Sequence, residues 1–107
     1  MMAGNLDDLV DKAIERILSA VKPKKIFLFG SAAHGKMREN SDIDMMVVVP
    51  NGMHRRKASQ GIYRKMIGLG FAVDIVVVTE EDLEKYRDTP GYIIQSAMRE
   101  GKLMYAA

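Results

Sequence analysis

The stretch from residue 28 to residue 44, LFGSAAHGKMRENSDID, decides the fold of this chain. One apolar run ends at Gly30-Ser31, and a second begins at Asp42-Ile43-Asp44. Side chains two residues apart on a β-strand point to the same face, so Asp42 and Asp44 are expected to project together. Two carboxylates held this close repel each other unless a cation lies between them, and Mg²⁺ prefers such oxygen ligands. The pair favours a metal site, although an isolated Asp-x-Asp is also typical of a solvated turn.

A third acid strengthens the metal interpretation. Asp74 lies inside the β-branched run Phe71 to Val78, which predicts a buried strand. A buried carboxylate usually has a partner or a metal, because burying it alone is costly. The alternatives are an acid on an edge strand or one paired with a lysine. Three carboxylates on two neighbouring strands, beside a Gly-Ser turn, favour a metal-binding site.

The Gly-Ser turn itself suggests phosphate binding. Gly30 allows the backbone to approach a phosphate closely, and a following helix N-terminus would offer free N–H donors. The hydroxyl of Ser31 adds another donor. Residues 30–37 nearly spell a P-loop, but Met37 stands where that motif needs a Ser or Thr to hold Mg²⁺. The P-loop interpretation also leaves the acidic pair unexplained.

Periodicity and turn signals give the order of elements. The short insert between the first two strands is most simply accommodated if these strands are antiparallel. The expected fold class is therefore α/β, with a small mixed β-sheet and flanking helices. The expected elements are a helix over Leu6–Val21, strands over Lys25–Phe29 and Asp42–Val49, a basic helix over His54–Leu69, a strand over Phe71–Val78, helices opening at Thr79 and at Thr89-Pro90, and a short edge strand over Leu103–Tyr105.

Length and composition bound the function. The 107 residues suffice for a single domain, residues 1–107, with one modest core. The absence of cysteine excludes disulfides, thiolate nucleophiles and Cys-based zinc sites. A net charge of +2 gives no reason to expect direct nucleic-acid binding. No apolar run approaches the length of a membrane span, and the N-terminus lacks a signal pattern, so a cytoplasmic protein is expected.

The motifs together resemble a known family. Gly30-Ser31, then Asp42-Ile43-Asp44 after ten residues, then Asp74, resemble the signature of the DNA polymerase β-like nucleotidyltransferase superfamily. At this length the chain is similar to the minimal nucleotidyltransferases, the MNT proteins often paired with HEPN-domain partners. The resemblance covers nearly the whole chain; it also includes Phe29, Gly35, Arg38, Ser41 and the closing residues 100–105.

The resemblance implies an activity and a set of roles. It implies a polymerase β-like fold and transfer of AMP from ATP to a tyrosine hydroxyl of a HEPN toxin, by an antitoxin. Asp42, Asp44 and Asp74 would be the catalytic acids and would hold two Mg²⁺ ions. Gly30, Ser31 and Arg38 would bind the nucleotide. The family often has arginines where this chain has Ala32 and His34, which leaves Arg38 as the main cation of the insert.

Alternatives remain open at this point. A non-catalytic antitoxin that blocks its partner by occupancy is favoured by Ala32 and His34 and opposed by the three acids. An enzyme acting on a small molecule or RNA is disfavoured, because few residues remain for a substrate domain. The sequence leaves open the donor base, the acceptor and a homo-oligomeric state. Both sheet faces are apolar, so we expect a partner to dock on a face left open near the acids, unless the C-terminal helix covers it.

Overall fold

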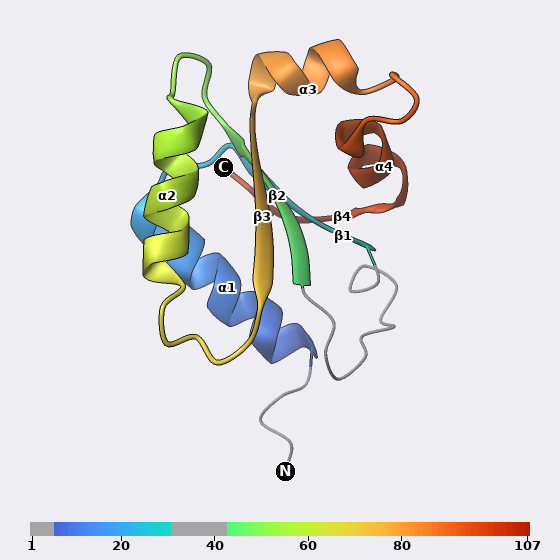
Figure 1. Ribbon diagram of the computed structural model, residues 1–107. Helices are drawn as coiled ribbons and strands as arrows, with labels where there is room; N and C mark the ends of the chain where they lie inside the picture. Colours follow the sequence, from blue (N-terminus) through green and yellow to red (C-terminus); the bar gives the residue numbers. More distant parts are fainter. Residues whose placement is uncertain (1–5, 31–42) are drawn as a thin grey trace.

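The computed structural model describes residues 6–30 and 43–107, and within these ranges it contains four helices and four strands (Figure 1). Residues 1–5 and 31–42 lie outside the description. The elements in chain order are α1 (Leu6–Ala20), β1 (Lys25–Phe29), β2 (Ile43–Val49), α2 (Arg55–Lys65), β3 (Val73–Thr79), α3 (Glu80–Tyr86), α4 (Ile93–Glu100) and β4 (Lys102–Ala106).

The strands form one mixed sheet in the order β3-β2-β1-β4. β1 is antiparallel to β2 and to β4, whereas β2 and β3 are parallel and are connected through α2. The expected mixed sheet and the antiparallel first pair are confirmed. Because β1 runs against β2 and β3, its last residues lie beside the first residues of those two strands. This end of the sheet therefore contains the Gly30 turn together with Asp44 and Asp74.

Helices α1 and α2 cover one face of the sheet. The apolar stripe of α1, with Val10, Ala13 and Ile17 buried, packs in one core with Ile62 of α2 and the alternating residues Ile43, Met45, Val47 and Val49 of β2. Arg16 of α1 forms hydrogen bonds to the C-terminal end of α2. Its Nη1 donates to Lys65 O at 2.7 Å and to Ile67 O at 3.2 Å. These bonds satisfy carbonyl groups at the end of α2 that have no partner within the helix.

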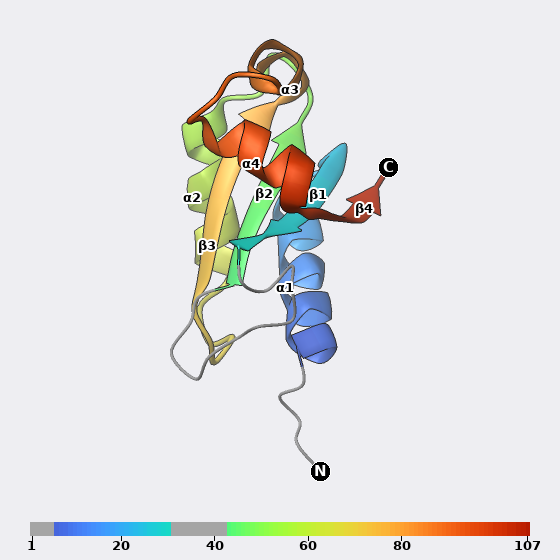
Figure 2. The same ribbon diagram turned by 90° about the vertical axis from the view of Figure 1, so that its right-hand side faces the viewer.

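Helices α3 and α4 cover the other face. Ile94 and Ala97 of α4 are buried against Phe27, Met46, Val48 and Val78. Figure 2 shows α4 in front of the strands and α1 behind them. Over the centre of the sheet the structure therefore matches the alternative in which the C-terminal helix covers this face, while docking of a partner beside the acids stays a prediction. The C-terminal helix supplies the missing cover, because its two buried apolar residues fill that surface.

A capping box fixes the start of α3 at the far end of the sheet from the Gly30 turn. The Asp82 N–H donates to Thr79 Oγ1 at 3.1 Å, and the Thr79 N–H donates to Asp82 Oδ2 at 3.1 Å. Arg55 pairs with the same Asp82 oxygen at 2.7 Å. Partial burial acts to raise the pKa of Asp82, but the Thr79 hydrogen bonds and the Arg55 charge together lower it below its ordinary value. The capping box predicted at Thr79 is confirmed.

Several element boundaries differ from the sequence predictions, by one residue at the end of α1 and at both ends of β4 and by more in three places. α2 ends at Lys65 and not at Leu69, and Gly68 and Gly70 then take positive φ angles that end helical geometry. β3 begins at Val73 and not at Phe71. Residues 89–92 form a turn closed by a Tyr92 N–H to Thr89 O bond, with Gly91 at φ +85°, so α4 opens at Ile93 and not at Pro90. In the described part of the chain, no helix combines the length and apolar character needed to span a bilayer.

Candidate active site

Asp44 and Asp74 lie next to each other on paired strands. In the parallel β2–β3 ladder they are register partners, and across β2 the residue opposite Asp44 is Phe29, the last residue of β1. Neighbouring strands are about 4.8 Å apart, and two unit charges at that separation repel by about 1 kcal/mol even in bulk water. This repulsion is the cost that a bound cation between the two carboxylates would remove.

Both carboxylates belong to the same face of the sheet. On β2, Met46 and Val48 pack toward α4, and on β3, Val76 and Val78 do the same. Asp44 and Asp74 each precede these residues by an even number of positions, so they share that face. The sequence prediction that Asp42 and Asp44 project together stays a prediction, because Asp42 lies outside the described residues. Asp44 and Asp74 lie at the starts of their strands, beyond the apolar surface that α4 covers.

Gly30 lies directly against Asp44. Its φ is +71°, a conformation that residues with a Cβ rarely adopt, and a Cβ built there would meet Asp44 Oδ2 at 2.5 Å. From the sequence, glycine is expected here because it lets a phosphate approach the backbone closely. The structure adds a second reason, since a Cβ at this position would force the Asp44 carboxylate to turn away from the end of β1.

The remaining predicted site residues are not placed. Ser31, Arg38 and Asp42 lie outside the described residues, as do Ala32 and His34. Within residues 6–30 and 43–107, no group of three or more His, Cys, Asp or Glu side chains could hold a metal ion. The described site therefore offers two carboxylates. Their oxygens suit Mg²⁺, which is commonly held by one or two carboxylates together with substrate phosphates.

Asp74 is not buried, contrary to the sequence prediction. β3 pairs only with β2 among the described strands, so it is an edge strand, and Asp74 is exposed. The apolar run over residues 71–78 predicted a buried strand. Such a run does not show whether a strand has one neighbouring strand or two, and the edge strand given as the alternative is the one found. The cost of burial therefore gives no reason to expect a metal at Asp74. The pairing with Asp44 carries the metal-site interpretation instead.

Tyr63 of α2 joins the site, and sequence reasoning missed it. Its hydroxyl lies 3.2 Å from Asp74 Oδ1, and it accepts the Ile75 N–H at 2.8 Å. The residue lies off the buried stripe of α2, which contains Ala58 and Ile62, so the sequence pattern indicates only a solvated helix face. No spacing rule links residue 63 to residue 74; the contact depends on how α2 crosses over β3.

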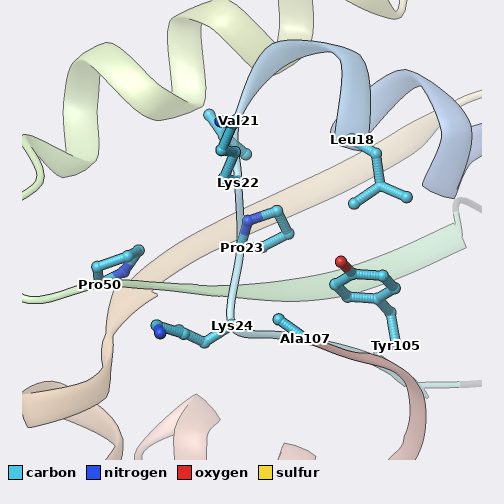
Figure 3. Close-up of a pocket in the computed structure, with 8 residues that line it drawn as sticks. All are labelled: Leu18, Val21, Lys22, Pro23, Lys24, Pro50, Tyr105 and Ala107. Atoms are coloured by element: carbon cyan, nitrogen blue, oxygen red, sulfur yellow. The ribbon is translucent and has the colours of Figure 1, made fainter.

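A separate hollow lies at the opposite end of the sheet. It is lined by the residues that precede β1 and follow β2, together with the end of β4 (Figure 3). Lys22, Lys24 and the hydroxyl of Tyr105 are its polar groups, and Leu18 and Pro23 are among its apolar ones. It contains no carboxylate side chain, so it lacks the ligands that a Mg²⁺-dependent site needs. We therefore place the candidate active site at the acids and not at this hollow.

Comparison with protein families gives one match over most of the chain. The family model described as "Polymerase beta, Nucleotidyltransferase" matches residues 12–107. This range includes Gly30, Asp44 and Asp74. No curated protein matches the chain.

Solved structures share the fold. A Sulfolobus solfataricus protein assigned to the nucleotidyltransferases is 21% identical with a TM-score of 0.63, over 95% of this chain and 80% of that one. A mutant of the MntA-HpeT toxin-antitoxin is 21% identical with a TM-score of 0.66, over 91% and 73%. A toxin-antitoxin with AMP-PNP is 25% identical with a TM-score of 0.64, over 91% and 73%. The expected polymerase β-like fold is confirmed.

Proposed function

Because the chain belongs to the polymerase beta nucleotidyltransferase family, we propose that it transfers AMP from ATP to a tyrosine hydroxyl of a HEPN-family toxin and so acts as an antitoxin. The observation that carries the proposal is the pairing of Asp44 with Asp74 on one face, beside the Gly30 turn. Two adjacent carboxylates next to a glycine turn suit a metal–triphosphate complex, because the acids can hold the metal while the backbone contacts phosphate oxygens.

Each residue then has a defined task. Asp44, with Asp42 before it, would hold Mg²⁺, and Asp74 would complete the set of ligands for two ions. Bound Mg²⁺ supplies positive charge that stabilises the charge developing on the phosphate oxygens. Gly30 and Ser31 hold the distal phosphates, and Arg38 grips them through its guanidinium group. Asp74, the exposed acid, orients the acceptor hydroxyl and accepts its proton.

The proposed transfer is a single displacement at the α-phosphorus of ATP. The acceptor oxygen forms a bond to the α-phosphorus of ATP, and the bond from that phosphorus to the bridging oxygen of the β-phosphate breaks. The products are a nucleotidylated acceptor and pyrophosphate, and the hydroxyl proton passes to Asp74. The exposure of Asp74 at the sheet edge supports this role, because a protein-borne hydroxyl must reach it from outside.

The choice of a toxin as partner and of an adenine nucleotide as donor is supported by one similar solved structure. The toxin-antitoxin with AMP-PNP covers 91% of this chain at 25% identity. It supports an adenine nucleotide as the donor and a toxin as the partner. The competing function is an antitoxin that neutralises its partner by occupancy alone, which the sequence favours through Ala32 and His34.

One experiment separates transfer from occupancy. The chain is incubated with a HEPN-family partner, ATP and Mg²⁺, and partner peptides are examined by mass spectrometry for AMP on tyrosine. We expect AMP with the wild type and with Asp11→Asn, a substitution at an exposed acid on α1, and none with Asp44→Asn. Neutralisation of the toxin by Asp44→Asn without nucleotide would support occupancy instead.

A further inference from the structure

The Tyr63 hydroxyl makes three contacts at the outer edge of β3. It lies 2.8 Å from Ile75 N, 3.2 Å from Asp74 Oδ1 and 3.4 Å from Ile75 O. The main-chain N–H and C=O of one strand residue point to the same side. Both groups of Ile75 therefore point away from β2, toward α2. Tyr63 occupies the place along this edge that a further strand would otherwise fill.

The direction of the hydroxyl proton follows from these contacts. The Ile75 N–H can only donate, so the Tyr63 oxygen accepts it and the Tyr63 proton must point elsewhere. Asp74 Oδ1 and Ile75 O are acceptors within reach. The carboxylate oxygen is the nearer, and hydrogen bonds to an ionised acceptor are the stronger kind. The hydroxyl therefore donates to Asp74.

We propose that Tyr63 is a positioning residue that holds the Asp74 carboxylate in its metal-binding orientation. This inference rests on the proposed function, in which Asp74 is a metal ligand. With Oδ1 engaged by Tyr63, the other carboxylate oxygen of Asp74 would remain available to a bound cation. Asp74 is exposed on an edge strand, so without this bond its side chain can turn into solvent, away from the repelling charge of Asp44.

A purely structural role is the alternative to exclude. Tyr63 also ties α2 to the edge of β3 through Ile75, and losing that tie would lower stability without any particular effect on metal binding. Tyr63→Phe removes the hydroxyl and keeps the ring. Tyr92→Phe is the matched control, because it makes the same chemical change at another exposed tyrosine, at the start of α4.

The test is a double-mutant cycle read by Mn²⁺ binding. Free Mn²⁺ is titrated by electron paramagnetic resonance into the full chain without nucleotide, and circular dichroism verifies that each variant is folded. Partners of metal ligands typically change metal affinity by about tenfold or more. We expect Tyr63→Phe to weaken Mn²⁺ binding about tenfold, Tyr92→Phe to leave it unchanged, and Tyr63→Phe to have no further effect in an Asp74→Asn chain.

The outcomes separate this inference from the function it rests on. If Asp74→Asn weakens Mn²⁺ binding and Tyr63→Phe does not, the metal site stands and the positioning role is overturned. Equal weakening by Tyr63→Phe with and without Asp74 overturns it too, because the hydroxyl then acts through the fold. A Tyr63→Phe chain that does not fold also overturns the positioning role. If neither Asp44→Asn nor Asp74→Asn changes Mn²⁺ binding, the metal site and this inference both fail.

Discussion

At the scale of single residues, Gly30 combines two constraints in one position. Its φ of +71° costs about 1–2 kcal/mol for a residue with a Cβ, and the Cβ would meet Asp44 Oδ2. We expect Gly30→Ala to lower the free energy of unfolding by this backbone contribution of about 1–2 kcal/mol and by a further amount, because the Asp44 carboxylate must turn away from the new methyl group. Urea denaturation followed by circular dichroism measures this change.

Gly52 provides the matched control for this prediction. Its φ is +89°, and nothing lies within 4 Å of a Cβ built there. Gly52→Ala should therefore lose only the backbone contribution, about 1–2 kcal/mol. Equal losses for the two variants would mean that the contact between Gly30 and Asp44 does not constrain the site.

The sequence was informative about residues whose roles follow from local spacing. The position of Asp44 at the start of its strand follows from the sequence pattern, whereas its shared face with Asp74 depends on the pairing register of β2 with β3. Tyr63 was not predictable, because its contact with Asp74 depends on the crossing of α2 over β3. The burial of Asp74 was predicted wrongly, since an apolar strand pattern does not say whether a strand has one neighbour or two.

At the scale of secondary structure elements, α2 contains a glycine that its fold does not require. Nothing lies within 4 Å of a Cβ built at Gly61, and its φ lies outside the left-handed range. Glycine inside a helix costs up to about 1 kcal/mol relative to alanine. We expect Gly61→Ala to raise the free energy of unfolding by about 0.5–1 kcal/mol in urea denaturation. A loss of stability would show that α2 needs the freedom of a glycine at this point.

The capping box of α3 gives a prediction that depends on pH. Asp82→Asn removes the charge at the start of α3 and should cost about 1 kcal/mol at neutral pH. Because the pKa of Asp82 is lowered in the folded state, its charged form stabilises the fold. That stability is present above about pH 4, the ordinary range of aspartate, and is lost as the pH falls through the folded-state pKa.

Thermal unfolding of both chains between about pH 7 and about pH 2.5 measures this dependence. The difference between wild type and Asp82→Asn should shrink steadily toward the acid end. Glu84→Gln, at an exposed residue whose contact with Arg87 is 3.7 Å long, should change little at any pH. A difference for Asp82→Asn that does not depend on pH would contradict the assigned role of its charge.

Element boundaries were predictable where one side chain or one turn sets them. The strand Lys25–Phe29 and the capping box at Thr79 were predicted as found. The start of α4 was not, because Thr89-Pro90 is a helix-opening pattern that Gly91 turns into a tight turn. The local pattern favoured a helix there, and the positive φ two residues before α4 decided against it.

At the scale of the whole molecule, two helices pack on each face of the sheet and cover its central strands. The surface that remains for an acceptor is the end of the sheet where β1 finishes and where β2 and β3 begin. The order of elements in the sequence predicted the mixed sheet. It left the cover of the second face open between a partner and the C-terminal helix, because a short amphipathic helix does not indicate in sequence which face it covers.

The central proposal is that the chain transfers AMP from ATP by means of the acids at this end of the sheet. Transfer of AMP moves the α-phosphorus of ATP to the acceptor, whereas transfer of a phosphate group would move the γ-phosphorus. The deciding measurement compares ATP labelled at the α-phosphate with ATP labelled at the γ-phosphate, each incubated with the chain, Mg²⁺ and a HEPN-family partner. We predict that the α-label appears on the partner, that the γ-label leaves as pyrophosphate, and that Asp44→Asn abolishes the transfer. Transfer of the γ-label, or undiminished α-label transfer by Asp44→Asn, would contradict the proposed reaction.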